Sequence, residues 1–173
     1  VRKCLEFGDF LDQWGSGILQ VYEMKSRDGL LRERYERQLC LRSTALGKLL
    51  APAVVKGLAI TGSDAYLREG SDVTIIFHVN NKALFLGGVD GFLKEARRKF
   101  GESLKESKTT HNDVTIESHV TPLREVSCYR CTLDEHVIYS NSLAGLKRVL
   151  DAQAGKVKRL SESQDFQYMR TVF

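Results

Sequence analysis

The sequence predicts an α+β fold, with a helical N-terminal segment followed by a mostly antiparallel sheet that has helices packed on one face. Apolar residues recur at helical spacing through the first third of the chain. After Lys56 the pattern changes to short, β-branched runs separated by turn residues. The 173 residues are 42% hydrophobic with only two prolines, which is typical of a folded globular chain. We expect three parts: helical segment 1–55, α+β sheet domain 56–155, and the start of a truncated helix in 156–173.

The helical segment has one apolar stripe before residue 30. Its members are Phe7, Phe10, Leu11, Trp14, Ile18, Val21 and Tyr22. A break at 27–29 separates this stripe from a second helix, whose inward residues are Leu31, Tyr35 and Leu39. A third helix is expected to begin at Ser43 or Thr44 and to end early because of Pro52.

The sheet domain begins with two predicted strands, a buried one at 57–61 and an alternating one at 72–79. A helical stripe then runs from Lys82 to Phe100. Its glycines are Gly87, Gly88 and Gly91, where we expect a neighbouring backbone to approach closely.

Three further strands are expected at 113–120, 124–132 and 136–139, the last two joined tightly through 133–135 as a β-hairpin. Ser140-Asn141-Ser142 offers N-cap residues for a helix that ends near Gly155. The composition makes disorder unlikely, with the polar stretches 101–112 and 155–165 as the candidate exceptions.

The charge pattern does not indicate a nucleic-acid partner. The net charge is only +4, and basic pairs such as Arg97-Arg98 and Lys158-Arg159 lie beside acidic residues. Nucleic-acid binders show a denser basic stripe with stacking aromatics. Solvated helix faces explain these charges better.

The cysteines and histidines do not form a metal-binding motif. Cys128 and Cys131 lie in a predicted strand, so their spacing puts the two sulfurs on opposite faces. No second pair completes a zinc motif, so we expect no metal and no cofactor. A site built from His78, His119 and Glu117 is conceivable if their strands pair, but ordinary strand histidines are the favoured interpretation.

The stretch from residue 61 to residue 74 comes close to a nucleotide-transfer signature. In that signature a Gly-Ser turn binds triphosphate, and two carboxylates on the next strand hold two metal ions. Gly62-Ser63 and Asp72 match the turn and the first carboxylate, but Thr74 stands at the second. Glu117 could add a third carboxylate without replacing the missing one. The chain thus has a partial resemblance to polymerase-beta-like nucleotidyltransferases with an incomplete carboxylate motif.

The residues of this loop are the best candidates for a surface site. Asp64, Arg68 and Asp72 are placed to form salt bridges or to bind a polar ligand, and Ser63 and Glu117 complete the candidate set. Local turn chemistry is the alternative, with glycine for positive φ and Ser or Asp for backbone hydrogen bonds. We assign no catalytic residue.

Three segments together resemble an uncharacterised family of large bacterial proteins that have a membrane anchor near the N-terminus. They are 35–41, 58–77 and the stretch from Ile138 to Arg170. The resemblance implies that Thr74 is usual for the family. It also implies an extracytoplasmic segment, with other domains of the same protein as partners and membrane contact only through segments outside this chain.

Two functional hypotheses follow. The first is a non-catalytic structural or interaction domain of a larger bacterial protein, an expectation also based on a start without Met and an end within a helical pattern. The alternative is a degenerate nucleotidyltransferase-like module that binds nucleotide or metal. The sequence indicates neither a compartment nor an oligomeric state.

Overall fold

A computed structural model describes residues 31–42, 53–63 and 72–172, and it has an α+β fold. The helices expected before residue 31 and over 43–52 lie outside these residues. The strands are β1 Val55–Gly62, β2 Val73–Val79, β3 Lys105–His111, β4 Val114–Val120, β5 Ser127–Leu133 and β6 His136–Ser140. The helices are α3 Leu31–Leu39, α5 Lys82–Phe100, α6 Leu143–Gln153 and α7 Gln164–Val172, with 3₁₀ turns η2 Gly101–Ser103 and η3 Leu160–Glu162.

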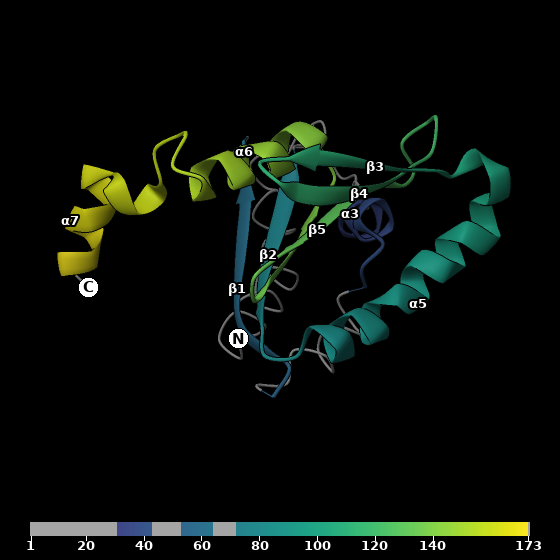
Figure 1. The fold of residues 1–173 in the computed structure, drawn as a ribbon, viewed down its shortest axis with the longest axis horizontal. Coiled ribbons are helices and arrows are strands. Elements are labelled where there is room, and N and C mark those ends of the chain that lie inside the picture. Colours follow the sequence, from purple (N-terminus) through teal and green to yellow (C-terminus); the bar gives the residue numbers. More distant parts are fainter. Residues whose placement is uncertain (1–30, 43–52, 64–71, 173) are drawn as a thin grey trace, which may run out of the picture.

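The six strands form one sheet in the order β1-β2-β6-β5-β4-β3. Every pairing among these strands is antiparallel, as the sequence predicted. After the neighbours β1 and β2, helix α5 carries the chain across the sheet to its far edge (Figure 1). Strands β3 to β6 then return as a meander, which brings β6 beside β2.

Helices cover both faces of the sheet, not one. Val137 and Tyr139 of β6 pack with α3 and α5 in the larger apolar core. The alternate residue Ile138 packs in a second core with Leu146 and Leu150 of α6. The expectation of a single covered face therefore holds for α3 and α5 but is wrong for α6. The cause is that β6 and β5 carry apolar side chains on both faces, so each face requires a cover.

Strand β3 lies in the stretch 101–112, which the sequence indicates as a candidate for disorder. Its residues are polar, and all but His111 are exposed. Its backbone is nevertheless fully registered against β4, from Lys105 opposite Val120 to His111 opposite Val114. The connecting residues Asn112 and Asp113 adopt left-handed φ values of 49° and 61°. An edge strand needs no apolar pattern when its order comes from pairing on one side.

The boundaries of α5 and α6 follow from their caps. Asn81 begins α5 by accepting a hydrogen bond from the backbone of Leu84 at 2.9 Å. Gly155 follows the end of α6 with φ of +73°. The expectation of close backbone approach along α5 is wrong at Gly87 and Gly91, because a Cβ at either would meet nothing within 4 Å.

The C-terminal part of the chain stands to one side of the sheet. In Figure 1, α7 lies beyond α6, and its packing is mainly against η3. Tyr168 and Met169 of α7 are 67% and 52% exposed, and Leu160 of η3 is 68% exposed. This part of the chain therefore adds little to either core.

Candidate functional site

The candidate site lies where β1 ends and β2 begins. The backbone N–H of Ser63 donates to Asp72 Oδ1 at 2.9 Å, and its Oγ donates to the same oxygen. Partial burial raises the pKa of Asp72, but the two hydrogen bonds from Ser63 outweigh it and hold this pKa below its usual value. Asp72 is thus an ionised carboxylate that joins the ends of the two strands.

Hydroxyl groups occupy the place where a second carboxylate would be needed. Thr74 is 1% exposed and lies opposite Ser140 of β6, which is fully buried. Their side-chain oxygens are hydrogen-bonded at 2.8 Å. A neutral, mutually satisfied pair of this kind cannot hold two divalent cations, which need bridging carboxylates. The sequence identified Thr74, but it did not identify Ser140.

Helix α6 closes the space beside these groups. Ser142 begins this helix and accepts a hydrogen bond from the backbone of Gly145 at 3.2 Å. A Cβ at Gly145 would lie 2.9 Å from Asp72 Oδ2. It would also lie 3.3 Å from Thr74 Oγ1 and 3.4 Å from Ser140 Oγ. The first turn of α6 therefore lies close to the carboxylate, and the partial positive charge at the helix N-terminus favours an anion there.

Asn141 connects three elements at this end of the sheet. Its Oδ1 accepts from the backbone N–H of Val73 at 2.7 Å, and its Nδ2 donates to Gln38 Oε1 of α3 at 3.0 Å. The sequence predicts residues 140–142 as alternative N-caps of α6, and the structure shows that Ser142 is the cap. Ser140 and Asn141 instead attach β6 to β2 and α3.

Glu117 is not part of this site. It lies on β4, separated from β2 by β6 and β5, and on the face that α5 covers. It accepts hydrogen bonds from Arg130 at 2.6 Å and pairs with Lys108 at 3.1 Å. The Arg130 guanidinium is the main cause of its lowered pKa. A third carboxylate from Glu117 beside Asp72 is therefore excluded by the topology.

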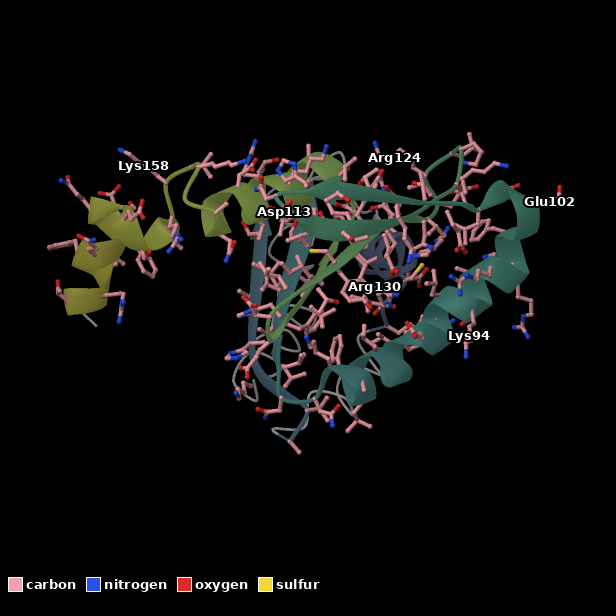
Figure 2. All side chains as sticks on the ribbon, in the orientation of Figure 1. Lys94, Glu102, Asp113, Arg124, Arg130 and Lys158 are labelled. Atoms are coloured by element: carbon pink, nitrogen blue, oxygen red, sulfur yellow. The ribbon has the colours of Figure 1, made fainter. Side chains whose placement is uncertain are left out.

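Arg130 is the centre of this second polar cluster. Besides Glu117 it donates to Asp90 of α5 at 2.7 Å, and its side chain is only 16% exposed. Figure 2 shows Arg130 between the sheet and α5, whereas Lys94 projects from the outer side of that helix. The cluster ties α5 to strands β4 and β5, which is a structural role.

The two strand histidines do not meet. His78 stacks on His136 with ring centroids 4.8 Å apart and contacts Glu135 at 2.9 Å. His119 lies on β4, with Nδ1 3.7 Å from Glu106 Oε1. Strand β2, which carries His78, pairs with β1 and β6, so it does not pair with β4, which carries His119. Within residues 31–42, 53–63 and 72–172, no group of three or more His, Cys, Asp or Glu side chains could hold a metal ion.

Asp64 and Arg68 lie outside the described residues, so the structure brings together only Ser63 and Asp72 of the five candidates.

Comparison with protein-family models, curated proteins and solved structures finds no match to this chain. Among the helices of the described part of the chain, none has both the length and the apolarity needed to cross a membrane.

Proposed function

We propose that this chain is a non-catalytic structural or interaction domain of a larger bacterial protein. The observation that carries the proposal is the closed hydroxyl pair of Thr74 and Ser140, with Gly145 of α6 packed against it. A two-metal transfer site needs acidic ligands and open space at this position. In this chain, the hydroxyl groups of Thr74 and Ser140 stand in place of the acidic ligands, and Gly145 of α6 fills the space beside them.

The polar residues around this pair have roles in joining elements. Ser63 and Asp72 connect β1 to β2, and Asn141 connects β2 to α3. Asn141 and the Thr74–Ser140 pair are buried, and buried polar groups that satisfy one another rigidify and specify a fold. The site therefore has a structural explanation that needs no ligand.

We propose other domains of the same full-length protein as the partners, in an extracytoplasmic setting. The support in the described residues is the position of η3 and α7, which stand beside the sheet with Leu160, Tyr168 and Met169 exposed (Figure 1). Exposed apolar side chains on neighbouring elements are common at interaction surfaces.

A thermal-shift titration tests the non-catalytic role. The protein is melted with ATP or GTP, with and without Mg²⁺ or Mn²⁺, beside an Asp72→Asn variant. We expect no rise in the melting temperature of either protein, because a ligand that does not bind the native state does not stabilise it. A ligand that did bind would stabilise the native state by about 2.7 kcal/mol at 100 times its Kd. A rise that needs both nucleotide and metal, and that Asp72→Asn abolishes, would refute the proposal.

One observation favours a second candidate, a degenerate nucleotidyltransferase-like module that binds nucleotide or metal. Gly62 and Ser63 end β1 next to Asp72, and the antiparallel neighbour β2 follows, as the transferase pattern requires. A crystal soaked with Mn²⁺ and a nucleoside triphosphate tests it. Two ions seated beside Asp72 would support this function, and an unchanged Ser63–Asp72 contact would reject it.

A further inference from the structure

A cavity lies between α3 and α5, on the face of the sheet opposite α6. Its volume is about 240 Å³. The lining residues that matter here are Glu33, Arg37, Cys40, Arg42, Glu95 and Lys99. Both signs of charge are present among its lining residues, which also include Cys40, whose Sγ donates to the carbonyl oxygen of Arg37 at 3.8 Å.

A second cysteine, Cys128, packs against the end of α3 next to Cys40. Cys128 of β5 is 2% exposed, and its Sγ donates to the carbonyl oxygen of Leu39 at 3.2 Å, one residue before Cys40. Cys40 itself follows the end of α3 with a left-handed φ of 50°, and it is 7% exposed. The cysteines are 88 positions apart in the sequence, so only the packing of α3 on β5 brings them together.

The two thiols differ in acidity. A hydrogen bond with the Cys128 thiol lowers the pKa of Cys40, with smaller contributions from Arg130 and Arg97, although burial opposes the shift. The same hydrogen bond and complete burial raise the pKa of Cys128. The thiolate, the attacking form in disulfide exchange, is therefore favoured at the cysteine that lines the cavity.

We propose that Cys40 and Cys128 form a dithiol–disulfide site, in which Cys40 reacts with a small peptide disulfide that enters through the cavity. The Cys40 thiolate attacks one sulfur of the substrate, and the other sulfur leaves as a thiol with the proton that Cys40 lost. Cys128 then loses its proton, attacks Cys40 Sγ and releases the second substrate thiol. The two electrons from the protein thiols reduce the substrate disulfide, and the product bond ties α3 to β5.

The cavity favours a substrate that carries both signs of charge. Arg37 and Lys99 can pair with carboxylates and Glu33 with an ammonium group, whereas Arg42 and Glu95 are paired with each other at 2.7 Å. Glutathione disulfide has both kinds of group and is the probe of choice. Cys131 is a matched control, because it lies in the core on the other face and burial raises its pKa to about 12.

The test incubates the native wild-type chain and the variants Cys40→Ser, Cys128→Ser and Cys131→Ser with glutathione disulfide, followed by intact-mass measurement and peptide mapping. We expect wild type and Cys131→Ser to lose about 2 Da through a Cys40–Cys128 bridge. Cys128→Ser should keep a glutathione adduct of about 305 Da on Cys40, because the resolving thiol is missing. Cys40→Ser should form neither product.

Melting curves of the reduced proteins establish that each variant is folded, so a negative result is meaningful. Failure of the folded wild type to form the Cys40–Cys128 bridge at equilibrium would overturn the proposal. A bridge that involves Cys131 or Cys4 in the native chain, or an adduct on a residue other than Cys40 in Cys128→Ser, would overturn it as well.

Discussion

Replacing Gly145 by alanine tests whether α6 closes the candidate site. The added Cβ would lie 2.9 Å from a carboxylate oxygen of Asp72, which Ser63 holds in place. Overpacking of this kind costs about 1–3 kcal/mol. The gain in helix propensity from glycine to alanine returns at most about 1 kcal/mol. Subtracting about 1 kcal/mol from about 1–3 kcal/mol leaves an expected net loss of about 0–2 kcal/mol. At about 2–4 °C per kcal/mol, this loss lowers the melting temperature by up to about 8 °C.

The control is Gly91→Ala in α5, where a Cβ meets nothing within 4 Å. This variant gains the same propensity without a clash, so it should be more stable by about 0.5–1 kcal/mol. Both are measured by urea denaturation monitored by circular dichroism. In the Asp72→Ala background, Gly145→Ala should lose less unfolding free energy than in wild type, because the carboxylate oxygen nearest to the added Cβ is no longer present. Equal stabilisation by both alanines would refute the packing that we describe.

Three further variants test the polar clusters. Ser63→Ala should raise the depressed pKa of Asp72 and so make the protein less stable than wild type at neutral pH. This difference in unfolding free energy should shrink as pH falls through about 4, because Asp72 becomes protonated. A difference in urea melts that does not change with pH would contradict this. Burial lowers the pKa of His119, so wild type should lose stability as pH falls below about 6.5, and His119→Gln should show a flatter profile from pH 7 to 5. Arg130→Met should cost about 1–3 kcal/mol in urea melts, because it leaves Glu117 and Asp90 without their shared cation, and no loss would reject that network.

Local pattern was sufficient for the elements with a clear apolar period. The alternation of β2, the stripe of α5 and the tight β5–β6 connection, where Asp134 has φ of 49°, are all confirmed. The opposite faces of Cys128 and Cys131 are confirmed too. Strand β3 was missed because its order comes from pairing with β4, which leaves no period in its own side chains.

The candidate site was predictable only in part. Ser63 and Asp72 are close in sequence and their turn is local, so the pattern indicated them correctly. The insertion of β6 beside β2 is a long-range event, so nothing in the sequence pointed to Ser140 opposite Thr74. The same long-range order places Glu117 on the wrong face for the site.

The polar edge strand β3 has a consequence for how copies of this molecule behave toward one another. Its exposed side chains include the cationic Lys105 and Lys108 and the acidic Glu106. Charged side chains along an exposed edge strand disfavour the pairing of a second copy on that edge. The polar composition of β3 therefore opposes growth of the sheet into fibrils from that edge. The same strand contributes almost nothing to either core.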